Sequence, residues 1–152
     1  VVAAGTREES FAVALLDVDH FKRINDTWGH STGDTVLRAV AQQIRRCLRP
    51  GDLECRYGGE EFVVILPSTS ERDAALVAER LRCGIAAHEF PDPLAAEKIT
   101  ASLGVAGWVP GEDASGLLRR ADQALYTAKR AGRNRVEVAA SAESPSFTGD
   151  GS

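Results

Sequence analysis

The 152-residue sequence contains no methionine, and only 6% of its residues are aromatic. No apolar run approaches the ~18–20 residues that cross a bilayer, and no signal peptide is recognisable. The formal net charge is −4, which gives no basic face for broad binding to nucleic acid. We therefore expect a cytoplasmic domain that contacts neither nucleic acid nor a membrane. Because the chain lacks methionine, we expect it to be part of a longer protein, which could itself be membrane-anchored.

Cysteine is also scarce. Cys47, Cys55 and Cys83 are odd in number, form no C-x-x-C pair, and two of them lie in apolar helical or strand patterns. This usage predicts buried free thiols in a reducing compartment rather than a disulfide framework.

The remaining composition is that of one globular domain, with 43% hydrophobic and 26% charged residues. Periodicity and turn residues predict an alternation of strands and helices. In chain order the predicted elements are a strand at 10–18, helices at 21–28 and 33–48, strands at 53–57 and 61–66, a helix from Ser70 to 88, a strand at 99–106, a helix at 115–131 and a strand at 133–138. This order predicts an α/β sandwich, in which helices flank a mixed central sheet. Residues 1–138 would form the domain, and residues 139–152 a disordered tail or linker.

Two acidic residues lie at the end of the first predicted strand. Asp17 and Asp19 have the same strand parity, so both side chains would lie on one side. Carboxylates at a strand end suit Mg²⁺, which also binds phosphates and water. Asp19 could instead cap the following helix, whereas Asp17 lies deeper, where an unpartnered acid would be costly.

Two glutamates follow a predicted tight turn. Gly58-Gly59 between two β-prone runs predicts a two-residue hairpin, because primed turns require positive φ. Glu60 and Glu61 after this turn could be an exposed hairpin tip. Together with Asp17 from another strand, they could form a metal site.

Two further groups of polar residues admit two interpretations each. Asn25, His30 and Asp34 could read a guanine edge, or Asp34 could favour the N-terminus of a helix. Lys129 and Arg133 could hold a triphosphate, or they could complement a helix C-terminus next to the candidate cap Gly132.

Four segments taken together resemble one family. They are D-V-D-H-F-K-R-I-N-D-T-W-G-H-S-T-G-D at 17–34, R-Y-G-G-E-E-F at 56–62, A-S-L-G-V-A at 101–106, and A-D-Q-A-L-Y-T-A-K-R-A-G-R-N-R-V at 121–136. The chain resembles the catalytic domain of GGDEF-family diguanylate cyclases over about residues 10–138, with a GGEEF hairpin. That resemblance implies a nucleotidyl cyclase or polymerase-palm-like (ferredoxin-like) architecture. It also implies condensation of two GTP molecules into cyclic di-GMP and two pyrophosphates by a homodimer.

The resemblance assigns roles to individual residues. It implies two Mg²⁺ ions per active site, with Mn²⁺ as an alternative, and it implies that the catalytic residues are Glu60, Glu61 and Lys22. The metals would be held by Asp17, the Val18 carbonyl, Glu60 and Glu61. The implied substrate-binding residues are Phe21, Lys22, Asn25, His30, Asp34, Gly58, Gly59, Lys129 and Arg133.

Arg49-Pro50-Gly51-Asp52 forms an R-x-x-D sequence before the hairpin. It resembles the family's product-inhibition site, with Arg80 as its second arginine, although a helix end and a turn would explain the same residues. Compared with the family, the sequence lacks the usual upstream D-x-L-T-x-L-x-N-R segment, which links to a regulatory domain. A non-catalytic sensor of GTP or cyclic di-GMP remains an alternative function, and so does a nucleotidyltransferase with another base preference.

Overall fold

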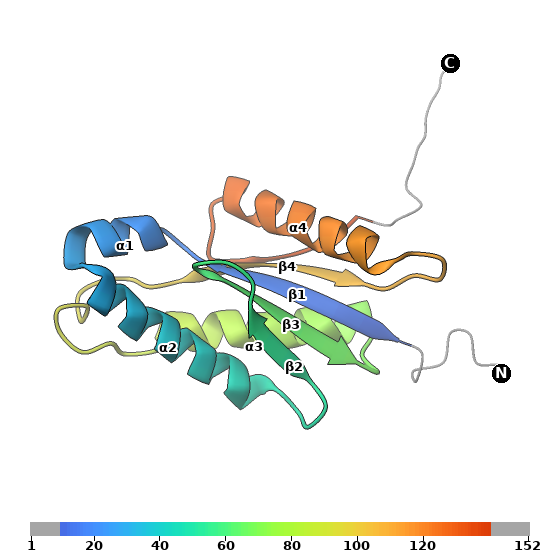
Figure 1. Cartoon of the computed structure of the whole chain (residues 1–152), viewed down its shortest axis with the longest axis horizontal. Coiled ribbons are helices and arrows are strands. Elements are labelled where there is room, and N and C mark those ends of the chain that lie inside the picture. Colours follow the sequence, from blue (N-terminus) through green and yellow to red (C-terminus); the bar gives the residue numbers. More distant parts are fainter. Residues whose placement is uncertain (1–9, 141–152) are drawn as a thin grey trace, which may run out of the picture.

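The computed structural model describes residues 10–140, which form a five-stranded mixed sheet with strand order β2-β3-β1-β4-β5 (Figure 1). The central strand β1 (Phe11–Val18) pairs antiparallel with β3 (Glu61–Pro67) and with β4 (Ala101–Gly107). The edge strand β2 (Leu53–Arg56) is antiparallel to β3, and the opposite edge strand β5 (Val136–Val138) is parallel to β4. The predicted mixed sheet is confirmed.

Helices cover both faces of this sheet (Figure 1). Helices α1 (Phe21–Trp28), α2 (His30–Cys47) and α3 (Glu71–Ala87) pack with Ala12, Ala14, Leu16 and Val18 of β1 in the larger hydrophobic core. Helix α4 (Ala114–Arg130) packs on the other face with Val13 and Leu15. Both parities of β1 are therefore buried, as the apolar run predicted.

Helix α4 lies unusually close to β4. A Cβ added to Gly104 would overlap the backbone of Ala121 and Leu125 in α4. Only glycine therefore allows this helix backbone to rest directly on the strand. The close approach fixes the position of the C-terminal turn of α4, which carries Lys129.

Two predicted helix features are confirmed, and one start is corrected. Ser70 caps α3 by accepting a hydrogen bond from the Asp73 amide at 3.1 Å. Gly132, with φ of 126°, directly follows the C-cap of α4. However, α2 begins at His30 instead of Gly33, because Gly29 (φ 95°) lets the chain pass directly from α1 into α2. Asp34 consequently lies in the second turn, so its interpretation as a first-turn acid was wrong.

The hairpin between β2 and β3 is present, but its turn differs from the prediction. Neither Gly58 nor Gly59 has positive φ, and residues 57–60 form a wider connection than a two-residue primed turn. The Tyr57 amide donates to the Glu61 carbonyl at 2.7 Å. The Arg56 guanidinium donates to the carbonyls of Gly58 and Gly59, at 3.4 and 2.7 Å. An arginine therefore replaces positive φ as the feature that shapes this turn.

The cysteine prediction is confirmed in part. All three thiols are free, but Cys55 and Cys83 are exposed and Cys47 is only half-buried. Cys55 is exposed because β2 is an edge strand, and Cys83 because it lies on the outer face of α3. Among the described residues, no helix is both long and apolar enough to cross a membrane.

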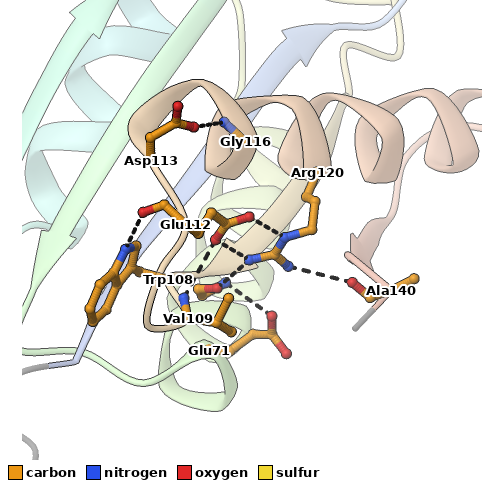
Figure 2. A network of polar contacts seen from close by, with 9 residues as sticks. Glu71, Trp108, Val109, Glu112, Asp113, Gly116, Arg120 and Ala140 are labelled. Carbon is orange, nitrogen blue, oxygen red and sulfur yellow. Dashed lines mark hydrogen bonds and ion pairs between the residues drawn. The ribbon is translucent and has the colours of Figure 1, made fainter. Parts of the chain in front are cut away.

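A polar network ties together the loop after β4 and the last described residues (Figure 2). Arg120 pairs with Glu112 at 2.7 Å, and both side chains are nearly buried. Arg120 also donates to the carbonyls of Gly107 (2.6 Å) and Ala140 (3.4 Å). The Ala139 amide donates to the Val105 carbonyl at 2.7 Å, so residues 139 and 140 remain attached to the domain. The rest of the predicted tail, 141–152, and residues 1–9 lie outside the described residues.

Candidate active site

The candidate site is built on the end of β1. Asp17 is only 3% exposed and lies directly opposite Glu61 of β3 in the sheet register. The Val18 amide donates to the Glu60 carbonyl at 3.3 Å, which holds the hairpin against β1. Lys129 of α4 contacts the Asp17 carboxylate at 2.5 Å. Residues from two strands, a hairpin and a helix therefore meet at this end of the sheet.

Three carboxyl groups crowd this point. Burial raises the pKa of Glu60, and the neighbouring Asp17 raises it further against the opposing effect of Lys129. The pKa of Glu61 is raised by the same two causes in the same order. Among the described residues, no group of three acidic, histidine or cysteine side chains is already arranged as a metal cage. The excess of carboxylates over the single ammonium nevertheless fits added divalent cations, which are hard ions that prefer oxygen ligands.

Asp19 belongs to a different network from Asp17. His20, not Asp19, is the N-cap of α1, and it makes no side-chain capping bond. Asp19 is 5% exposed and accepts hydrogen bonds from Thr100 Oγ1 and Ser102 Oγ, each at 2.7 Å, and from the Asn134 amide at 3.0 Å. The interpretation of Asp19 as a helix cap was wrong, and its oxygens are already engaged within the protein.

The residues predicted to bind a base lie around α1 and α2. The Asn25 Oδ1 atom is buried and has no hydrogen-bond partner among the described residues. A Cβ at Gly33 would overlap this oxygen and lie 3.1 Å from the buried Phe21 ring. Gly33 therefore makes the space that Asn25 occupies. A buried amide oxygen without a donor is costly, so this atom fits a ligand that donates a hydrogen bond.

The other predicted substrate residues of α1 and α2 are exposed. Asp34 lines a pocket of about 360 Å³ together with Arg38 and Arg56. His30 is exposed, and the exposed Lys22 pairs with Asp26 at 3.0 Å within α1. The structure thus brings Asn25, Phe21 and Gly33 together, whereas Lys22 is engaged elsewhere.

The hairpin glycines face open space. The nearest atom to a Cβ at Gly58 would be Glu61 Oε1 at 3.7 Å, and nothing would lie within 4 Å of one at Gly59. With φ negative at both positions, no contact within the described residues requires glycine here. The close approach of a phosphate therefore stays a prediction that these two residues allow.

Two cations lie at and just after the end of α4, and Lys129 contacts the site. The Gly132 amide bonds to the Lys129 carbonyl (3.4 Å), and the Arg133 amide bonds to the Ala128 carbonyl (3.0 Å), as in a Schellman motif. Arg133 has φ of 66°, and its side chain is exposed. Lys129 reaches Asp17, whereas Arg133 has no side-chain partner among the described residues.

The predicted product-site residues lie together, on the α3 side of the sheet. Arg49, Asp52 and Arg80 line one small pocket of about 110 Å³. Arg49 donates to both carboxylate oxygens of Asp52 (3.2 and 3.3 Å) and to Thr69 Oγ1 (2.8 Å). The turn interpretation is correct, because the Arg49 amide donates to Asp52 Oδ2 at 2.8 Å, whereas binding of the product here stays a prediction. Arg49 and Asp52 therefore form a preorganised pair at the mouth of a pocket.

Comparison with known proteins identifies the family of this chain. Residues 2–135 match the family model described as "Diguanylate cyclase, GGDEF domain". Diguanylate cyclase DgcP of Pseudomonas aeruginosa is 51% identical over 130 residues, which are 84% of this chain and 19% of that protein. Response regulator PleD of Caulobacter vibrioides is 46% identical over 80% of this chain and 28% of its own length. The chain therefore spans well under half the length of these curated relatives.

Solved structures show the same fold. The GGDEF domain of DgcB from Caulobacter crescentus, in complex with c-di-GMP, is 43% identical, with a TM-score of 0.80 over 85% of this chain and 77% of that one. The active GGEEF domain of a diguanylate cyclase from Vibrio cholerae is 36% identical, with a TM-score of 0.83 over 88% of this chain and 85% of that one. The expected α/β architecture is confirmed. The chain belongs to the GGDEF family of diguanylate cyclase domains.

Proposed function

We propose that this domain condenses two GTP molecules into cyclic di-GMP and two pyrophosphates. The observation that carries the proposal is the buried Asp17 carboxylate beside Glu60 and Glu61 at one end of the sheet. Three relatives that are 42–51% identical are named diguanylate cyclases, which supports the same reaction here.

Divalent metal ions are part of this proposal, and family members generally use one. Asp17, Glu60, Glu61 and the Val18 carbonyl would hold two Mg²⁺ or Mn²⁺ ions. When bound, such ions lower the pKa of a hydroxyl and neutralise charge on phosphates. The fit rests on the donor set, because crowded carboxylates are stabilised by added positive charge.

The protein's own residues then position the substrates. The 3′-hydroxyl oxygen of one GTP attacks the α-phosphorus of the other, the bond to pyrophosphate breaks, and the reaction occurs twice. Glu60, beside the proposed metal ions, would help to take the hydroxyl proton. Lys129, Arg133 and Lys22 would bind the phosphates, which requires Lys129 to exchange its contact with Asp17 for the substrate.

Guanine would be selected between α1 and α2. The unpartnered Asn25 Oδ1 offers an acceptor, and the Asp34 carboxylate offers another, for the N–H groups of the base. Adenine presents a different donor pattern, so an acceptor pair of this kind discriminates against it. Phe21 and His30 would lie beside the nucleotide, and Gly58 and Gly59 would admit its phosphates.

Each domain would bind one GTP, so two copies must face each other across a twofold axis. The domain would act in the cytoplasm as part of a longer protein, under an upstream regulatory domain. A solved relative, SiaD of Pseudomonas aeruginosa, is described in complex with its activator SiaC, which supports external control of this domain type. A non-catalytic nucleotide sensor is the alternative, and the intact acidic hairpin favours the enzyme.

Incubation with nucleotide tests this function. The chain at high concentration with Mg²⁺ and GTP should yield cyclic di-GMP and pyrophosphate, whereas ATP should yield no cyclic dinucleotide. Nucleotide chromatography measures both products, and a parallel sample with EDTA is the control. Binding of GTP without any product would favour the sensor, and equal turnover of ATP would contradict the guanine assignment.

Product inhibition gives a second prediction. Arg49→Ala should raise the cyclic di-GMP concentration needed for half-inhibition by roughly tenfold or more, because the product loses a charged fork of donors. The uninhibited rate should not change, because Arg49 lies in the pocket with Asp52 and Arg80, separate from the Asp17 site. The measurement is a rate series with added product in a sample that dimerises.

The matched control for this variant is Arg46→Ala. Arg46 is an exposed arginine in the last turn of α2, the helix that ends just before Arg49, and it is not part of the pocket. Its removal should leave inhibition unchanged. If cyclic di-GMP inhibits Arg49→Ala as strongly as the parent, the R-x-x-D sequence does not bind the product and forms only a turn.

A further inference from the structure

The loop that carries Arg133 has an unfavourable backbone. Three consecutive residues have positive φ: Gly132 at 126°, Arg133 at 66° and Asn134 at 49°. Glycine adopts such angles freely, and a Schellman turn requires only this one residue. The same region is disfavoured for an arginine, whereas asparagine adopts it more readily, so two successive residues of this kind are favoured by support from outside the loop.

Asp19 supplies the first support, at the backbone. Its Oδ2 atom accepts the Asn134 amide at 3.0 Å, and Thr100 and Ser102 hold the same carboxylate with bonds of 2.7 Å. Asp19 is 5% exposed and forms no ion pair within residues 10–140, so these three hydrogen bonds compensate its burial. Charged acceptors in buried surroundings make stronger hydrogen bonds than neutral ones. The end of β1 thereby fixes the backbone of residue 134.

Arg82 supplies the second support, at the side chain. Its Nη1 atom donates to Asn134 Oδ1 at 2.8 Å. Glu79, three residues earlier in α3, holds the same guanidinium at 2.6 and 2.9 Å, so its orientation is set before it meets Asn134. Asn134 is thus held through its amide by β1 and through its side chain by α3.

We propose that Asp19 and Arg82 are positioning residues that hold Arg133 for the outer phosphates of the nucleotide. The proposal rests on the proposed function, in which Arg133 contacts those phosphates. Arg133 itself has an exposed side chain with no partner among the described residues, so its placement depends on its backbone. A fixed backbone at residue 134 also fixes the direction in which the Arg133 side chain points. Arg133 then loses less conformational entropy when it binds a phosphate.

Two nucleotides that differ in their outer phosphates test the proposal. The full 152-residue chain is titrated by calorimetry, in the presence of Mg²⁺, with GMP and with α,β-methylene GTP, which cannot release pyrophosphate. Arg82→Gln and Asp19→Asn should each weaken the triphosphate analogue by roughly tenfold, while GMP affinity stays within twofold. A merely structural defect would weaken both ligands equally, and that outcome overturns the proposal.

A reference variant, Arg133→Ala, separates the phosphate contact of Arg133 from the positioning role of Asp19 and Arg82. Arg133→Ala should weaken the triphosphate analogue at least as much as either positioning variant. If it does so while Arg82→Gln and Asp19→Asn bind normally, the positioning role alone is wrong. If Arg133→Ala has no effect, the phosphate assignment fails and the positioning role fails with it.

A control variant distinguishes a specific effect on triphosphate binding from a general loss of stability. Glu112→Gln alters a carboxylate that also accepts from a backbone amide and an arginine, but in the network shown in Figure 2. It should leave both affinities unchanged.

Hydrogen exchange needs no nucleotide, so it tests the loop directly. The Asn134 amide should exchange faster in Asp19→Asn than in the parent. Unchanged exchange there would overturn the support attributed to Asp19. If Asp19→Asn does not fold, Arg82→Gln still tests the proposal, because Arg82 is farther from the core.

Discussion

Replacing Asp17 by asparagine is expected to abolish cyclic di-GMP synthesis, with a fall in rate of roughly 10³-fold or more. The substitution keeps the size of the side chain but removes its charge, which the proposed metal ions and Lys129 both require. Because Asp17 is almost fully buried, no neighbouring acid can take its place without moving a strand. Chromatography of GTP reactions with Mg²⁺ measures the loss, and circular dichroism checks that the fold persists.

Asp113→Asn is the matched control for this experiment. Asp113 is the N-cap of α4 and accepts the Gly116 amide at 2.9 Å. Asparagine caps helices about as well as aspartate, so synthesis should continue at the parent rate. A rate for Asp17→Asn within a few-fold of the parent would contradict the proposed site.

The second large effect concerns stability. Gly104→Ala should destabilise the domain by about 3 kcal/mol or more, because its Cβ would overlap the backbone of α4. Backbone atoms cannot turn aside as a side chain can, so the helix must move away from the sheet. That movement would also separate Lys129 from Asp17, so nucleotide binding should weaken along with stability. Urea unfolding followed by circular dichroism measures the change.

Gly84→Ala provides the contrast. Its Cβ would lie 2.8 Å from Oε1 of Gln43, the flexible end of a side chain that can rotate away. Alanine also favours a helix over glycine by about 1 kcal/mol. Gly84→Ala should therefore be neutral or stabilising. A similar loss in both variants would mean that the β4–α4 contact is not especially close.

Local pattern was sufficient to predict most of the fold. The apolar run at 10–18 predicted a strand buried on both faces, and β1 has cores on both sides. Ser70 with Asp73, and Gly132, marked helix ends that the structure contains. These features depend on interactions within a few residues, which a sequence shows directly.

Contacts between distant residues were not predictable in this way. Asp19 resembles a helix cap until its partners, 81 to 115 residues away, are known. Periodicity also could not show that β2 is an edge strand, so Cys55 was expected to be buried. Lys129 and Asp17 are 112 residues apart, and only family resemblance placed them in one site before the structure did. Arg82 and Arg56 carried no recognisable sequence signal for the contacts they make.

The network in Figure 2 also indicates where labels can be attached to the domain. The Trp108 amide bonds to the Phe11 carbonyl at 2.8 Å, and Arg120 of α4 donates to the Ala140 carbonyl at 3.4 Å. The first residues of β1 and the last described residues therefore lie on either side of β4, toward the end of the sheet opposite Asp17. With a rise of about 3.3 Å per residue, Phe11 lies roughly 20 Å along β1 from Asp17. Fluorophores or surface tethers placed at both ends would report on the separation of two domains while leaving their nucleotide faces free to meet.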